Sequence, residues 1–111
     1  MIAKQKELVL IPYPFTDQSG TKVRPAIIVS NDEYNSCCDD CVLVPVTSVL
    51  KEDKYSLSLT QIDLNSGTLV TESRIKVDKI FCIDKKLIIK KIGIIKGTTF
   101  RKIVDKFNTI L

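Results

Sequence analysis

The stretch that decides the fold is PYPFTDQSGTKVRPAIIVS, which runs from Pro12 to Ser30. Its first half contains two prolines, an aspartate, a serine and a glycine, which are typical of turns, and it predicts a loop. Its second half, Ala26–Val29, is a continuous, mostly β-branched apolar run between a proline and a Ser-Asn-Asp turn signal. Such a run predicts a buried strand that follows the loop.

Arg24 lies where the predicted loop meets the predicted strand. Pro25 follows it, and the residue before a proline is steered away from helical backbone angles, so Arg24 should be extended. Its guanidinium is always charged and presents a planar fork that suits phosphate or carboxylate. Arg24 is therefore a candidate anion-binding residue, and the alternative is a surface salt bridge with Asp17 or Glu72.

The rest of the chain predicts further short strands. We expect strands at residues 7–11, 42–47, 55–60, 68–70, 72–83 and 87–89, a polar connection at 31–40 and a turn at 64–67. Pro45 predicts that its strand lies at an edge or a bulge, because proline cannot donate to the sheet ladder. Alternation predicts that Tyr55, Leu57 and Leu59 face inward, and it breaks near Asp78–Lys79, which indicates a bulge or bend.

The C-terminal segment has a different periodicity. Phe100, Ile103, Val104 and Phe107 follow the spacing of an amphipathic helix, with Thr98 or Thr99 as its cap and an Arg101–Asp105 pair on its surface. Six or seven short strands and one packed helix are the make-up of a compact SH3-like β-barrel. With 111 residues, we expect one mainly β domain over residues 1–111.

Charge is distributed unevenly along the chain. The net charge is +4, but residues 31–53 hold six acids and one lysine, whereas residues 74–106 hold eleven bases and three acids. This asymmetry favours a surface that faces a polyanion such as nucleic acid, the alternative being a solvated lysine-rich surface. No apolar run approaches the ~20 residues that cross a membrane, and no signal peptide is evident, so we expect a cytoplasmic protein.

The chain has no histidine, which excludes two-histidine ribonuclease, Ser-His and Cys-His designs. Of its four cysteines, Cys38-x-x-Cys41 is half of a zinc-site pattern, but no second pair completes it. We expect reduced thiols in a loop, no cofactor and no metal, with metal binding through Asp39 or Asp40 as the alternative. Any catalysis would rely on Arg, Lys, carboxylate, hydroxyl or thiol groups.

Three groups of residues together resemble the PemK/MazF toxin family, the toxic halves of bacterial and archaeal toxin–antitoxin pairs. They are PFTDxSGxKxRPA from Pro14 with its apolar strand, VPVTS at 44–48, and SRIKVDKI at 73–80 continuing to Ile83–Asp84. The resemblance implies a CcdB/PemK-type SH3-like barrel, a homodimer, an antitoxin partner and an endoribonuclease that cuts single-stranded RNA at a short motif. A non-catalytic CcdB-like toxin that binds a protein such as DNA gyrase is the alternative.

The resemblance also nominates site residues. Arg24 and Thr47 match the two positions that the family most regularly uses for cleavage. Lys76 and Asp78 have the spacing at which the PemK/Kid branch places an arginine and an aspartate as acid and base; the alternative for Asp78 is a turn carboxylate paired with Lys79 or Lys76. The expected RNA contacts are Thr16, Ser19, Lys22, Ser48, Ser73 and Lys79.

Overall fold

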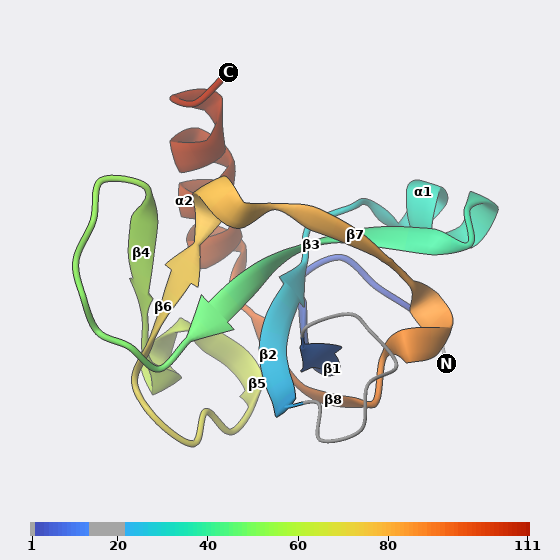
Figure 1. The fold of residues 1–111 in the computed structure, drawn as a ribbon, viewed down its shortest axis with the longest axis horizontal. Coiled ribbons are helices and arrows are strands. Elements are labelled where there is room, and N and C mark those ends of the chain that lie inside the picture. The colour runs from blue at the N-terminus through green and yellow to red at the C-terminus, as the bar shows by residue number, and fades with distance from the viewer. Residues whose placement is uncertain (1, 14–21) are drawn as a thin grey trace.

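The computed structural model describes residues 2–13 and 22–111, and Figure 1 shows how their elements are arranged. The strands are β1 (Glu7–Tyr13), β2 (Lys22–Ile28), β3 (Asp40–Thr47), β4 (Ser56–Leu59), β5 (Leu64–Gly67), β6 (Ser73–Lys76), β7 (Phe81–Asp84) and β8 (Lys90–Ile95). The helices are α1 (Asp32–Cys37), α2 (Gly97–Asn108) and the 3-10 turns η1 (Gln61–Asp63), η2 (Val77–Lys79) and η3 (Lys85–Leu87).

The strands form one curved antiparallel sheet with the order β4-β6-β3-β2-β1-β8-β5, and β7 pairs with β3 beside this path. The first strand, β1, therefore lies between β2 and the last strand, β8. Helix α2 is the C-terminal element and stands against one side of the sheet (Figure 1). The prediction of a mainly β fold with a C-terminal helix is confirmed.

β3 is an interior strand that exchanges partners along its length. On one side it pairs with β2 over residues 43–45; on the other it pairs with β7 over residues 40–43 and with β6 over residues 46–47. Pro45 lies between the part of β3 that pairs with β7 and the part that pairs with β6. Of the two positions predicted for Pro45, an edge or a bulge, the edge is therefore wrong, because β3 has partners on both sides. The missing N–H is tolerated where the ladder on one side is already interrupted.

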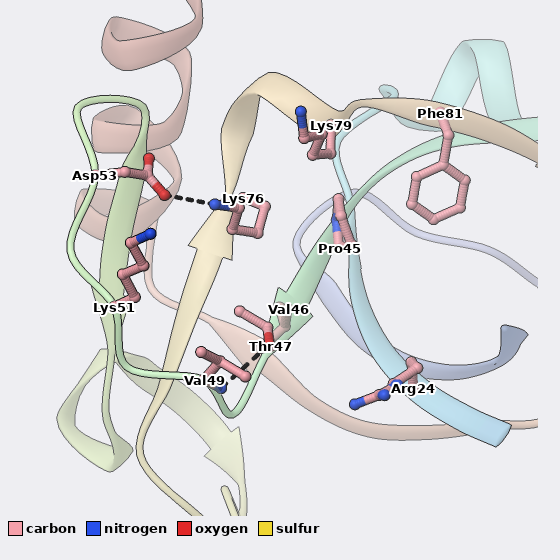
Figure 2. A pocket seen from close by; sticks show the side chains of 10 residues that line it. All are labelled: Arg24, Pro45, Val46, Thr47, Val49, Lys51, Asp53, Lys76, Lys79 and Phe81. Carbon is pink, nitrogen blue, oxygen red and sulfur yellow. Dashed lines mark hydrogen bonds and ion pairs between the residues drawn. The ribbon is translucent and has the colours of Figure 1, made fainter. Parts of the chain in front are cut away.

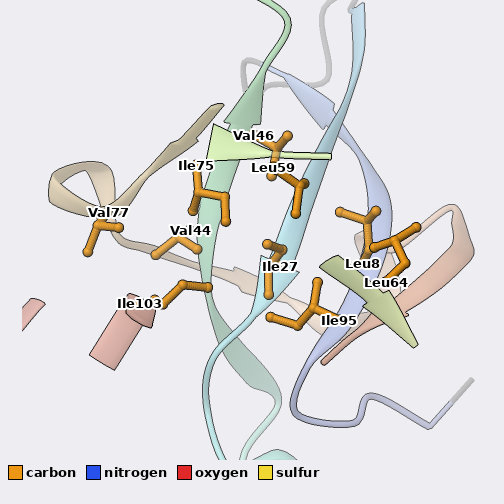
Figure 3. Packing of buried hydrophobic residues seen from close by; sticks show 10 residues of the cluster. All are labelled: Leu8, Ile27, Val44, Val46, Leu59, Leu64, Ile75, Val77, Ile95 and Ile103. Carbon is orange, nitrogen blue, oxygen red and sulfur yellow. The ribbon is translucent and has the colours of Figure 1, made fainter. Parts of the chain in front are cut away.

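Apolar side chains pack on both faces of the sheet because successive residues of a strand point to opposite faces. On one face, Ile27, Val44 and Ile75 pack with Ile103 of α2, as Figure 3 shows. On the other face, a second cluster is built from Val9, Ile11, Ala26, Ile28, Cys41, Leu43, Ile83 and Ile88, with Ala3 beside them. We call these the helix-side core and the outer core.

Helix α2 is confirmed at Gly97–Asn108, and Arg101 forms the expected i,i+4 pair with Asp105 at 3.3 Å. The predicted threonine cap is wrong: Lys96 is the N-cap residue and its side chain makes no capping bond. Thr99 is instead buried and donates a hydrogen bond of 3.0 Å to Asp63 Oδ1. This contact fixes the start of α2 to η1, so the threonine serves tertiary packing.

Two expected connections contain regular structure. Residues 32–37 form α1, whose N-cap Asn31 accepts a hydrogen bond of 2.8 Å from the backbone N–H of Tyr34. An asparagine followed by two acids is a helix-start signal, which the prediction of a polar connection overlooked. The predicted turn at residues 64–67 is strand β5, which pairs with β8.

Three strand predictions need correction. Residues 68–70 and 87–89 are not strands; the last strand is β8, at Lys90–Ile95. In β4, Leu59 is buried and Leu57 half-buried, as expected, but Tyr55 precedes the strand and Ser56 is buried. The expected break near Asp78–Lys79 is confirmed as the 3-10 turn η2.

Within residues 2–13 and 22–111, no helix is long and apolar enough to span a membrane.

Replacing Ile75 by alanine should test the helix-side core. Ile75 is fully buried at 0% exposure, in the strand that joins β3 to β4, so the truncation should leave a cavity and lower the free energy of unfolding by about 2–5 kcal/mol. Urea denaturation followed by circular dichroism measures the loss. Val70→Ala is the control: Val70 is 94% exposed, and its change should stay within about 0.5 kcal/mol. Equal losses in both variants would contradict the assigned core.

Candidate functional site

A pocket of about 530 Å³ opens where β2, β3, β6 and the β3–β4 loop meet (Figure 2). It is lined by Arg24, Pro45, Val46, Thr47, Val49, Lys51, Asp53, Lys76, Lys79 and Phe81. Four of these side chains are cations and one is a carboxylate, so the pocket is positively charged. Its residues come from segments far apart in sequence, and the sheet brings them together.

Strand alternation explains why Arg24 and Thr47 meet. In β2, Ala26 belongs to the outer core, and Arg24 lies two residues earlier on the same face. In β3, Leu43 belongs to the outer core, and Thr47 lies four residues later, again on that face. The two polar residues therefore continue the face of the outer core.

β6 contributes to the same side of the sheet. Its Ile75 points into the helix-side core opposite Val46, so its neighbours Arg74 and Lys76 point the other way. Arg74 lies directly across from Thr47 in the β3–β6 register, whereas Lys76 is the β6 residue that lines the pocket. The site is thus a polar extension of a sheet face whose other end is a packed core.

Thr47 is held by its own backbone turn. The backbone N–H of Val49 donates a hydrogen bond of 3.1 Å to Thr47 Oγ1. A threonine hydroxyl has one proton to donate and two acceptor lone pairs, so accepting this bond leaves its proton available for a ligand. The strand-end hydroxyl of Thr47 therefore contacts its own backbone without losing its capacity to donate.

Arg24 is half-buried on β2, and Figure 2 shows its guanidinium extending from the strand toward the side of the pocket where Thr47 lies. Among residues 2–13 and 22–111, no carboxylate forms an ion pair with Arg24, and this includes Glu72. Asp17, the other expected partner, lies outside the described residues. The described part of the site therefore offers an arginine fork that faces a polar pocket.

Lys76 reaches the opposite end of the pocket, where its Nζ lies 2.5 Å from Asp53 Oδ2. The hydrogen bond from Lys76 lowers the pKa of the Asp53 carboxyl below its usual value, so Asp53 is ionised at neutral pH. Sequence reasoning missed Asp53. Its only local signal is an Asx-type turn, in which the N–H of Tyr55 donates to Asp53 Oδ1 at 3.0 Å.

The structure does not bring Asp78 into the pocket lining. Asp78 lies on η2, and its Oδ2 is 3.5 Å from the ammonium of Lys79, which does line the pocket. This is the turn-carboxylate arrangement that the alternative interpretation described. Lys76 pairs with Asp53 instead, so the carboxylate of the pocket is Asp53.

The other expected RNA contacts are dispersed. Lys22 and Ser48 are exposed but do not line the pocket. Ser73 is buried and donates a hydrogen bond of 2.9 Å to the carbonyl of Thr71, so this geometry gives it a structural role instead of a surface for RNA. Thr16 and Ser19 lie outside the described residues.

All four cysteines are free thiols: Cys37 and Cys82 are exposed, Cys38 is half-buried and Cys41 is buried. Burial raises the pKa of Cys41 to about 11, because a thiolate is poorly solvated in the outer core. In the described part of the chain, no group of three or more histidine, cysteine, aspartate or glutamate side chains is arranged to hold a metal ion.

Thiol labelling should separate these cysteines. With iodoacetamide at pH 8, Cys37 and Cys82 should be modified first, and Cys41 only after the protein is unfolded in urea, as measured by peptide mass spectrometry.

The raised pKa of Cys41 favours the protonated thiol in the folded state. Its contribution to stability is therefore fully present below the ordinary thiol pKa of 9.0 and is lost as pH rises through about 11. Cys41→Ala should lack this part of the pH dependence, and modification of native Cys41 as fast as Cys37 would contradict its burial.

The chain as a whole matches a family model, that of the PemK-like, MazF-like toxin of type II toxin–antitoxin systems, over residues 4–111. The chain therefore belongs to this toxin family, and the resemblance found in its motifs is confirmed. A search of curated protein sequences found no match to this chain.

Solved structures agree on the fold. A MazE–MazF structure from Deinococcus radiodurans superposes with a TM-score of 0.81 at 19% identity, covering 99% of this chain and 96% of that chain. An endoribonuclease from a mycobacterial species, in complex with its cognate antitoxin, gives 0.76 at 20% identity, covering 96% and 92%. The Mycobacterium tuberculosis toxin MazF-mt6 gives 0.75 at 13% identity, covering 93% of each.

Proposed function

We propose that this toxin is an endoribonuclease that cleaves single-stranded RNA at a short sequence motif, using the RNA's own 2′-hydroxyl as nucleophile and no metal ion. The observation that carries the proposal is the convergence of Arg24 and Thr47, the two positions that match the family's cleavage residues, on one basic pocket. The similarity to structures described as endoribonucleases supports it.

In the proposed reaction, the 2′-oxygen forms a bond to the adjacent phosphorus and the bond from phosphorus to the 5′-oxygen breaks. Negative charge grows on the non-bridging oxygens of the phosphorane, where Arg24 donates two charge-assisted hydrogen bonds and Thr47 donates one. The arginine guanidinium is a permanently charged planar fork, so the role of Arg24 is electrostatic. The histidine-free composition is compatible with this mechanism because the substrate supplies the nucleophile.

Lys76 is the proton donor on the leaving-group side of this site. Its ammonium can donate to the departing 5′-oxygen, as the arginine at the equivalent spacing is expected to do in the PemK/Kid branch. Asp78, proposed from the sequence as the base, lies beside Lys79 and outside the pocket lining. We therefore propose that the 2′-hydroxyl loses its proton to solvent and not to Asp78.

We further propose that residues 1–111 act as a single toxin domain, that two copies form a homodimer, and that an acidic antitoxin is the partner. A basic pocket attracts an acidic tail, and a disordered tail that folds on binding can cover a large surface. Structures of MazF-type toxins with their antitoxins support this partner for the present chain. Occupation of the Arg24 pocket by the tail would block RNA.

Substitution of Arg24 should test the site. Arg24→Ala removes a clamp on the phosphorane and should slow cleavage ~100-fold or more, equivalent to about 3 kcal/mol of barrier. Thr47→Ala removes one hydrogen bond to a charged group and should cost about 1.5–3 kcal/mol. Single-turnover cleavage of a long RNA measures both.

Arg101→Ala is the matched control, since Arg101 is an exposed arginine on α2 outside the pocket and should leave the rate unchanged. Cleavage by Arg24→Ala at the rate of the unmodified protein would refute the assignment. If the unmodified protein leaves RNA intact but stalls DNA supercoiling by gyrase, the chain is a CcdB-like binding toxin instead.

The products report the mechanism directly. Attack by the 2′-oxygen should leave a 2′,3′-cyclic phosphate, or the 3′-phosphate formed by its hydrolysis, and a 5′-hydroxyl. Cleavage should persist in EDTA, and one deoxyribose at the scission position should block it. Mass spectrometry of the fragments checks the ends. A 5′-phosphate, or loss of activity in EDTA with recovery in magnesium, would show that a metal-activated water is the nucleophile.

A further inference from the structure

The proposed reaction gives no role to the one carboxylate among the described residues that line the pocket. Asp53, on the β3–β4 loop, is an anion in a pocket that should bind a polyanion, so it opposes RNA binding. Its pairing with Lys76 also neutralises one of the four cations of the pocket. A carboxylate at this place weakens the attraction of RNA unless it contributes to the reaction.

Asp53 is held on both sides. Its Oδ1 accepts a hydrogen bond of 3.0 Å from the N–H of Tyr55, and its Oδ2 lies 2.5 Å from Lys76 Nζ. Its own carbonyl accepts a bond of 3.4 Å from the N–H of Ser56, at the start of β4. The carboxylate is therefore fixed to β4 and presents one oxygen to the ammonium of Lys76.

Ser56 joins this carboxylate to the sheet. It is 5% exposed and lies directly across from Lys76 in the β4–β6 register. Arg74 donates from Nε and Nη2 to Ser56 Oγ at 3.1 and 2.8 Å, and from Nη2 to the Ser56 carbonyl at 3.2 Å. The arginine thus clamps β4 to β6 and sets where Asp53 stands relative to Lys76.

Lys76 needs such a support because of its chemistry. A lysine ammonium is a point charge on a flexible four-carbon stem, and it lacks the planar fork that orients an arginine. Its side chain is 27% exposed, so without a partner the ammonium would sample many positions. The ion pair with Asp53 keeps it at the pocket wall, on the same sheet face as Thr47.

We propose that Asp53 is a positioning residue that holds the Lys76 ammonium in the pocket for the cleavage step, at the expense of RNA affinity. This inference rests on the proposed function. It predicts two effects of opposite sign when the carboxylate is neutralised: binding of RNA strengthens, because an anion leaves the pocket, and the chemical step slows, because Lys76 is no longer fixed.

Asp53→Asn is the test, because asparagine keeps an oxygen that can accept from Tyr55 but removes the charge. The rate constant of the chemical step (here kcat), measured in a single turnover, should fall ~10-fold. The Kd for an uncleavable RNA with one deoxyribose at the scission position should fall ~2–5-fold at low salt. Lys76→Met should also lower kcat, and Asp53→Asn in the Lys76→Met background should cause no further loss, because Asp53 acts through Lys76.

Asp105→Asn is the matched control, since it removes the acid of an ion pair on α2, away from the pocket, and should change neither kcat nor Kd. An unchanged kcat in Asp53→Asn, or a loss that adds to that of Lys76→Met, would overturn the proposal. So would a changed cleavage motif, which would show that Asp53 reads a base. The proposed function fails separately, if the unmodified protein does not cut RNA or if Arg24→Ala cuts it at full rate.

Discussion

The two-residue periodicity of β3 is the constraint on which the structure depends. Val44 and Val46 point into the helix-side core, whereas Cys41 and Leu43 point into the outer core. Pro45 and Thr47 point to the same face of the sheet as Cys41 and Leu43. A shift of one residue in the pairing of β3 would turn Thr47 into the helix-side core and move a valine into the site. Both cores therefore fix the register that places Thr47 on the face of Arg24.

Local patterns predicted the elements whose signals are complete within a few residues. The apolar run after Arg24, the periodicity of α2 and the break at Asp78–Lys79 all have counterparts in the structure. β5 was misread as a turn because Leu64–Gly67 contains asparagine, serine and glycine, and its strand geometry comes from pairing with β8, distant in sequence. Long-range pairing overrode local turn propensity there.

The candidate site shows the same difference between residues that local motifs predict and residues that only long-range strand pairing brings together. Arg24, Thr47 and Lys76 could be nominated because each stands in a motif, and all three line the pocket. Asp53 could not, because its partner Lys76 is 23 residues away and only the β4–β6 pairing brings the two together. Ser73 was nominated by its motif, but the inward side of β6 gives it a backbone partner. Sequence motifs give residue types, and the register decides which side of the sheet each one faces.

The pairing of β1 with β8 has a consequence for how the toxin is made in the cell. During synthesis, β1 emerges from the ribosome before β2 to β7, whereas its neighbour β8 and the helix that follows β8 emerge after them. Folding dominated by such long-range contacts is slow, because distant segments must meet before their contacts can compensate for the lost chain entropy. The nascent chain carries Arg24, Thr47 and Lys76 before β8 is available to complete the sheet. A sheet that is completed slowly leaves an interval in which a partner can meet the toxin before its site is aligned.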